Sequence, residues 1–143
     1  MTGKAYNEIE TGQTFSASLT VTETHIVLGA GLFGDFNPLH VNEEFCKETS
    51  FKTRILHGPL TSALISAPIG NFFAGTAIAY LEHNCRFIKP VKAGDTLTTE
   101  WTILEKIDKL KHNGGIAVMS ATCHNQDMIS VAEANGKILL KNR

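Results

Sequence analysis

Asp35 and His40 are the residues of this sequence best suited to proton transfer, and they lie five positions apart in the segment 34–40. Pro38 fixes its own φ and restricts Asn37 before it, so the segment is expected to be a stiff loop. Such a loop can turn a carboxylate and an imidazole toward one point, where they would hold a water and move its protons near neutral pH. The alternative is an Asn-Pro turn in which both side chains are structural.

A second candidate group begins at His57-Gly58-Pro59, where proline favours the first turn of a helix. The first turn leaves backbone N–H groups free and carries the positive end of the helix dipole. A thioester carbonyl placed at Gly58 would be polarised, and an enolate oxygen stabilised. The alternative is an ordinary helix start that uses glycine for its backbone freedom.

Ser62 and Ser66 lie four positions apart and therefore share one face of this helix. Hydroxyls on a buried helix need hydrogen-bond partners. They either bond back to helix carbonyls or meet the side chains of the loop.

Composition limits the class of protein. The 143 residues suit one domain, 1–143, and 43% apolar with 19% charged residues are typical of a globular chain. A net charge of −1 gives no basic excess for nucleic acid. Cys46, Cys85 and Cys123 form no C-x-x-C pair, so we expect no metal site, no disulfide framework and a reducing, cytoplasmic compartment.

Residues 58–81 carry no charge and are long enough to span a bilayer. Pro68, Gly70 and Gly75 interrupt this run, so a buried helix followed by a strand is the better interpretation. We therefore expect no membrane association.

The hydrophobic pattern predicts an α+β fold. Thr22 or Thr24 caps a short helix through Leu28, and Asn42 starts another. The long helix from Gly58 ends between residues 68 and 71 and is apolar on most sides, so it should be buried all round. Strands are expected at 15–21, 78–87, 97–103, 116–124 and 128–140. Strands grouped after a helix indicate an antiparallel sheet packed on that helix.

Gly29 to Gly34 matches the dinucleotide pattern G-x-G-x-x-G. That fingerprint requires the glycines to open a helix against a pyrophosphate, and Pro38 prevents such a helix here. The rest of the chain also lacks alternating strands and helices, so we expect no nicotinamide cofactor.

Residues 34–40, with Phe45, Cys46 and Thr49 after them, resemble the signature of the MaoC-like, (R)-specific enoyl-CoA hydratases. His57-Gly58, Ser66 and the stretch 87–95 are similar to the same family. The resemblance covers about residues 15–131. It implies a hot-dog fold, a sheet wrapped around the long helix, and a homodimer with an acyl tunnel.

Carried over residue by residue, the resemblance makes Asp35 and His40 the catalytic pair, Gly58 the oxyanion donor and Ser66 the active-site helix serine. Asn37 would shape the loop, and Asn37, Pro38 and Ser62 are expected to bind the substrate. The implied reaction is addition of water to a trans-2-enoyl-CoA without metal or cofactor. His40 would withdraw the proton of water as hydroxyl attacks C3, and a proton would return to C2 with help from Asp35.

Two residues depart from the family pattern: Phe33 replaces a small hydroxyl residue, and Cys46 a small alanine or serine. Two other functions stay open from the sequence, a hot-dog acyl-CoA thioesterase and a non-catalytic acyl-CoA-binding module. His57 is expected to be structural. Four basic residues are candidates for binding the phosphates of coenzyme A: Arg54, Arg86, Lys89 and Lys92.

Overall fold

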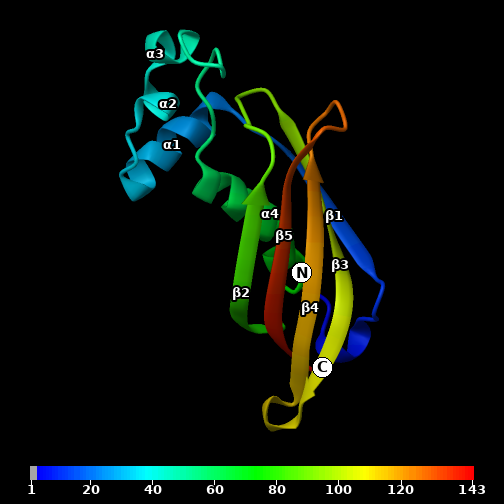
Figure 1. Cartoon of the computed structure of the whole chain (residues 1–143). Coiled ribbons are helices and arrows are strands. Elements are labelled where there is room, and N and C mark those ends of the chain that lie inside the picture. The colour runs from blue at the N-terminus through cyan, green and yellow to red at the C-terminus, as the bar shows by residue number, and fades with distance from the viewer. Residues whose placement is uncertain (1–2) are drawn as a thin grey trace.

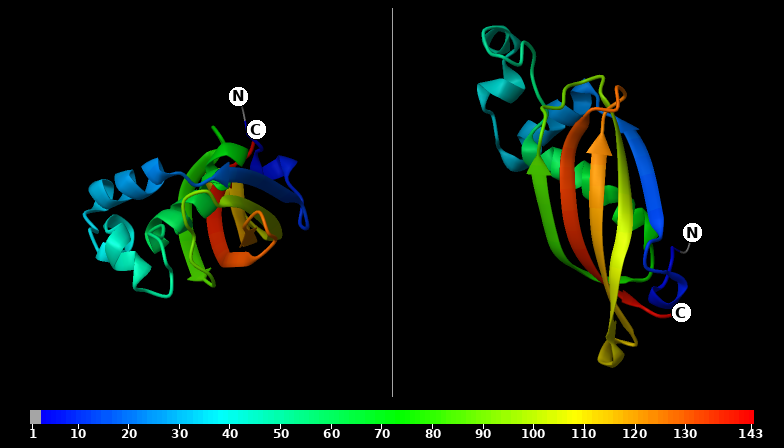
Figure 2. Two further views of the ribbon diagram at one scale, coloured as in Figure 1. Left: turned by 90° about the horizontal axis from the view of Figure 1, so that it is seen from above. Right: turned by 45° about the vertical axis from the view of Figure 1, so that its right-hand side comes forward.

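The computed structural model describes residues 3–143, and its centre is one antiparallel sheet in the order β1-β3-β4-β5-β2 (Figure 1). The strands are β1 (Thr14–Thr20), β2 (Ala77–Phe87), β3 (Thr96–Lys109), β4 (Gly114–His124) and β5 (Ser130–Lys141). Two one-turn 3₁₀ helices, η1 (Tyr6–Glu8) and η2 (Leu110–His112), lie at the lower end of the sheet in Figure 1. The sheet curves around α4 (Gly58–Phe72), as Figure 2 shows. The predicted α+β arrangement is confirmed.

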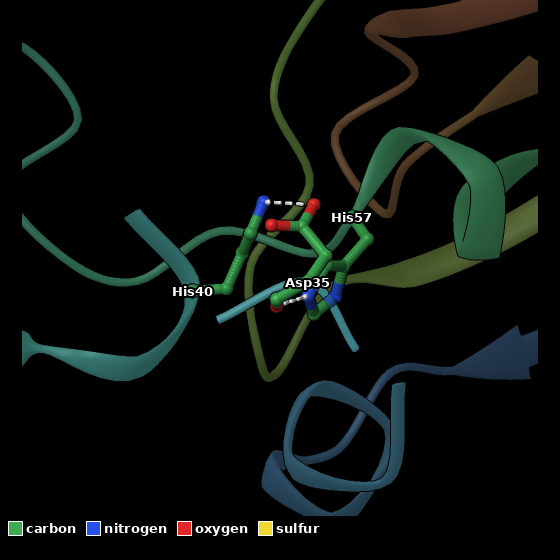
Figure 3. A group of neighbouring side chains, drawn as sticks. All are labelled: Asp35, His40 and His57. Carbon is green, nitrogen blue, oxygen red and sulfur yellow. Dashed lines mark hydrogen bonds and ion pairs between the residues drawn. The ribbon is translucent and has the colours of Figure 1, made fainter. Parts of the chain in front are cut away.

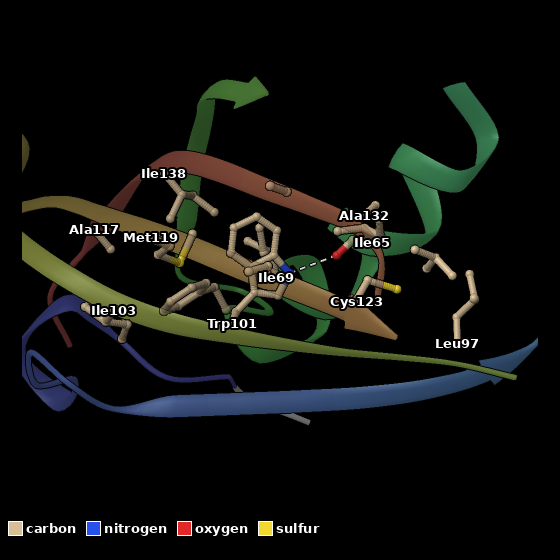
Figure 4. Packing of buried hydrophobic residues seen from close by; sticks show 14 of the residues in the cluster. Ile65, Ile69, Leu97, Trp101, Ile103, Ala117, Met119, Cys123, Ala132 and Ile138 are labelled. Carbon is tan, nitrogen blue, oxygen red and sulfur yellow. Dashed lines mark hydrogen bonds between the residues drawn. The ribbon is translucent and has the colours of Figure 1, made fainter. Parts of the chain in front are cut away.

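One face of α4 is held by the sheet. The Trp101 indole on β3 is fully buried and donates to the Ile65 carbonyl at 2.8 Å, while Ile65 and Ile69 pack among the core side chains of the strands (Figure 4). A buried aromatic of this size contributes several kcal/mol, typically about 3–5 on truncation. The opposite face carries exposed Pro59 and Ala63, so the prediction that α4 is buried all round is wrong for this chain alone. The curved sheet covers only one side of a helix.

Three short helices, α1 (Glu23–Phe33), α2 (Pro38–Val41) and α3 (Glu43–Lys47), project beyond the end of the sheet (Figures 1 and 2). We call them the overhang. The Arg54 guanidinium joins its two ends, because it pairs with Glu23 of α1 and with Glu43 of α3. Arg54 was considered for phosphate binding, but its guanidinium is already paired with two carboxylates and links α1 to α3.

Residues 34–40 differ in part from the expected loop. Gly34 ends α1 in the left-handed conformation, with φ of 75°. Pro38 then begins α2, with the Asn37 side chain accepting a hydrogen bond from the Leu39 amide at 3.0 Å. Proline at the first helical position and asparagine as its cap are a favourable pair, so His40 lies on a helical turn. Asn42 caps α3 as predicted.

The uncharged run 58–81 divides into α4 and the beginning of β2. Across residues 3–143, no helix has the length and apolar character that crossing a membrane requires.

The turn before β3 is built around a buried carboxylate. Asp95 is 2% exposed and accepts hydrogen bonds from the Lys92 amide at 2.9 Å, the Lys92 ammonium at 3.1 Å and the Gln126 amide at 3.1 Å. Burial by itself would raise the pKa of Asp95, but these donors together lower it below its usual value. Asp95 therefore ties the β2–β3 turn to the β4–β5 turn as an ionised group.

We expect Asp95→Asn to lower the free energy of unfolding by about 1–3 kcal/mol at pH 7, because an amide nitrogen would then face donors in a buried site. Folding favours the ionised form, so this stabilisation is complete above the ordinary carboxyl pKa of about 4 and is lost as the pH falls through the lower folded-state pKa. Urea denaturation at pH 7, 5 and 3 measures the difference. Asp127→Asn, in the exposed β4–β5 turn, is the control; an equal effect of both changes would contradict the assignment.

Candidate active site

The overhang brings the two predicted proton-transfer residues together. His40 Nε2 lies 3.7 Å from Asp35 Oδ2, with the His40 side chain 11% and the Asp35 side chain 47% exposed (Figure 3). This distance is longer than a direct hydrogen bond, so both atoms are placed to bond to one shared oxygen. The Asp35 carboxylate also accepts from the Asn37 amide at 3.1 Å, which fixes its orientation.

The other nitrogen of His40 is held by the backbone. Its Nδ1 lies 2.7 Å from the Ile55 carbonyl oxygen, and the Ile55 amide donates to the Leu39 carbonyl at 3.1 Å. A carbonyl can only accept, so Nδ1 carries the proton of the neutral ring. Nε2 of the neutral ring is then a free acceptor directed at Asp35, as a general base requires.

His57 contacts both residues of this pair. Its ring is fully buried and stacks on His40 with centroids 3.7 Å apart, and its Nε2 donates to the Asp35 carbonyl at 3.0 Å. His57 was expected to be structural, and its backbone partner lies 22 positions away in the chain. Phe33, the departure from the family pattern, packs edge-on against the His57 ring at 4.9 Å.

Gly58 lies directly after His57, at the start of α4, where the first-turn amides have no partner inside the helix. A β-carbon at this position would lie 3.3 Å from the Phe87 ring. Gly58, Phe87 and Lys89 are among the residues lining a pocket of about 320 Å³ at this end of the helix. The Gly58 backbone therefore borders a pocket, and its assignment as an oxyanion donor stays a prediction.

The two serines of α4 lie elsewhere. Ser66 donates to the Ala63 carbonyl at 2.9 Å, within its own helix, and Ser62 lies 2.6 Å from His83 Nε2 on β2. Within residues 3–143, neither hydroxyl has a hydrogen bond to Asp35 or His40. Asn37 and Pro38 act locally, as the cap and first residue of α2.

One nitrogen or oxygen each of Asp35, His40 and His57 fall within 4.8 Å of one another, a spacing that can hold a metal ion. His57 Nε2 is already bonded to a carbonyl, and its Nδ1 faces α1, 3.1 Å from where a β-carbon on Gly29 would be. Only Asp35 and His40 have ligand atoms that face each other freely. Two ligands make a weak metal site and a suitable water site.

Sequence reasoning missed two contributors. The Ile55 carbonyl orients His40, and a backbone group leaves no sequence signal. The sequence indicates that Ser62 needs a hydrogen-bond partner, but no signal in it identifies His83 as that partner.

Fold and site together define a hot-dog protein in which an aspartate and a histidine lie together at the amino end of the central helix. The chain belongs to the family described as MaoC like domain, whose sequence profile matches residues 4–123. An (R)-specific enoyl-CoA hydratase of Rhodospirillum rubrum is 40% identical over 106 residues, covering 74% of each chain. A 3-hydroxybutyryl-CoA dehydratase of Methylorubrum extorquens is 30% identical over 136 residues, covering 95% of this chain and 82% of the relative. The unliganded R-hydratase of Pseudomonas aeruginosa has a TM-score of 0.86 at 35% identity, covering 97% of this chain and 86% of that one.

We expect the two stacked imidazoles to be opposite tautomers when neutral, His40 protonated at Nδ1 and His57 at Nε2, because each of these nitrogens faces a carbonyl. Long-range ¹⁵N–¹H correlation spectra of ¹⁵N-histidine protein at pH 8 distinguish the two tautomers. His40→Gln and His57→Gln assign the signals. A His40 ring protonated at Nε2 would contradict the geometry and remove the free acceptor at Asp35.

Proposed function

We propose that this protein catalyses the reversible, (R)-specific hydration of a trans-2-enoyl-CoA, with Asp35 and His40 acting on one water. The observation that carries the proposal is the fixed His40 ring, whose Nδ1 bonds to the Ile55 carbonyl while Nε2 lies 3.7 Å from the Asp35 carboxylate. The names of the relatives from Rhodospirillum rubrum and Methylorubrum extorquens support the substrate class and the stereochemistry.

In the proposed reaction, a water bound by Asp35 and His40 attacks C3 of the enoyl group. His40 Nε2 takes the proton of that water as the C3–O bond forms. The electrons of the double bond move toward the thioester oxygen, which the Gly58 N–H stabilises at the positive end of α4. A proton then returns to C2 with help from Asp35, so that the elements of one water are added and neither acid nor base is consumed.

Substrate entry is proposed at the pocket beside Gly58. Lys89 is one of its lining residues, and its ammonium suits the phosphates of coenzyme A. Arg86 and Lys92 pair with Glu133 and Asp95, so they are weaker candidates.

Asp35→Asn and His40→Gln should each lower kcat for crotonyl-CoA hydration by about 10²–10⁴-fold, the usual contribution of a general acid or base. Loss of absorbance of the enoyl thioester follows the reaction, and chiral analysis of the product gives its configuration. Asp35→Asn keeps an oxygen for the Asn37 amide, so its fold should persist.

Asp127→Asn, in an exposed turn, is the matched control and should keep full activity. Activity retained in either site variant would reject the assigned roles. Free thiol released from acyl-CoA at a rate that depends on Asp35 would instead establish a thioesterase.

We also propose that the protein is a homodimer joined along β2. This strand lies at the edge of the sheet, and Ile78 and Leu81 on it are about half exposed. Ala63 and Ala67 on the uncovered face of α4 are exposed too. An apolar edge strand beside an apolar helix face is costly in a monomer and suits pairing with a second copy.

Leu81→Lys should convert the dimer to a monomer, because a charge on an edge strand opposes pairing. Sedimentation velocity measures the change. Leu110→Lys, on the exposed η2 turn that follows β3, places the same charge away from β2 and should leave the dimer intact. A wild-type monomer, or a dimeric Leu81→Lys protein, would refute this interface.

A further inference from the structure

Two separate pockets lie between α4 and β2, one lined by Gly58 and Phe87 and one by Ser66 and Tyr80, and we call the space between these elements the gap. The two elements run in opposite directions, so Gly58 faces Phe87 at one end and Ser66 lies with Tyr80 at the other. The pocket at the Ser66 end has a volume of about 370 Å³ and mainly apolar walls, including Ile69 and Ile138. An acyl chain held by its thioester at Gly58 and extended along α4 would point toward this pocket.

A hydrogen-bonded bridge crosses the gap between the two ends. Ser62 Oγ on α4 lies 2.6 Å from His83 Nε2 on β2, and His83 Nδ1 lies 2.6 Å from the Tyr80 hydroxyl. Tyr80 and His83 share a face although they are three positions apart, because a bulge displaces the register between Tyr80 and Glu82. We call these three side chains the Ser62–His83 bridge.

The bridge is complete in its hydrogen bonding. Burial lowers the pKa of His83 below its usual value, so the ring is neutral near pH 7. A neutral ring donates through one nitrogen and accepts through the other, and the two hydroxyls match these roles in either tautomer. No ring nitrogen is left for a polar ligand, so the bridge is built to close the gap rather than to bind a substituent.

We propose that the Ser62–His83 bridge limits the substrate to short-chain enoyl thioesters by separating the Gly58 end of the gap from the apolar pocket at Ser66. This inference rests on the proposed hydratase function. Ser62 lies one turn beyond Gly58, about 6 Å along the helix, which leaves room for a chain of the crotonyl type. A longer chain must break the contact between Ser62 and His83 and leave two hydrogen-bonding groups unpaired against a hydrocarbon.

His83→Ala and Ser62→Ala each test the bridge, the first by removing its largest member and the second by a smaller change. The measured quantity is the ratio of kcat/KM for trans-2-octenoyl-CoA to that for crotonyl-CoA. We expect the ratio to be well below one in the wild type and to rise roughly tenfold in each variant, the gain expected if about two of the four additional methylenes enter the apolar pocket. His112→Ala, on the exposed η2 turn, is the matched histidine control and should leave the ratio unchanged.

Binding of butyryl-CoA and octanoyl-CoA, measured by titration calorimetry, gives the same comparison without turnover. A gain in octanoyl-CoA affinity relative to butyryl-CoA in both variants supports the bridge. If the wild type hydrates neither enoyl-CoA, that absence of turnover refutes only the proposed function. Crotonyl-CoA hydration with an unchanged ratio in both folded variants would overturn the bridge alone. Release of free coenzyme A that depends on Ser62 and His83 would also overturn it, because the pair would then be a nucleophile and its base.

Discussion

The site depends on one buried histidine at the start of the central helix. His57 caps α4, donates from Nε2 to the Asp35 carbonyl and stacks its ring on His40. These contacts join the segment that carries Asp35 and His40 to the amino end of α4. A loop of polar residues projecting from a sheet would otherwise sample many arrangements, and fixing each residue costs about 1–2 kcal/mol of conformational entropy. The buried ring provides the fixed point that makes the arrangement specific.

The need to accommodate His57 also explains one glycine, Gly29, of the segment that resembles a dinucleotide fingerprint. Gly29 lies inside α1, where a β-carbon would approach His57 Nδ1 to 3.1 Å and a Leu60 methyl carbon to 2.9 Å. Gly34 ends the same helix in the left-handed conformation. These glycines therefore let a helix pack closely and end sharply, whereas a dinucleotide site needs them to open a helix. The prediction that this segment is no such fingerprint rested on Pro38 and on the lack of alternating strands and helices, and the placement of the glycines gives a third reason.

The sequence allowed the fold to be predicted because its strongest patterns are local. Alternation along β3, the proline at the start of α4 and the Asn42 cap are each determined within a few residues. The length of α1 was underestimated because glycines are poor helix formers, although Gly29 is favoured there by its close packing against His57. The proximity of Asp35 and His40 was predictable from their spacing and from proline. The roles assigned to the two serines depend on which side of α4 each faces and on what covers it, which no local pattern contains.

The two faces of α4 make different demands on the sequence. The face toward the sheet is fixed by apolar packing and by the bond from Trp101 to the Ile65 carbonyl, so it can be rigid without containing any reacting group. Gly58, Ser62 and Ser66 repeat every four residues on another face, which turns toward the gap beside β2. A helix held firmly on one side presents groups at intervals of about 6 Å on the other. The proposed reaction uses the amino end of this helix, and the proposed limit on acyl-chain length depends on Ser62 one turn further along, so the two can vary independently in the sequence.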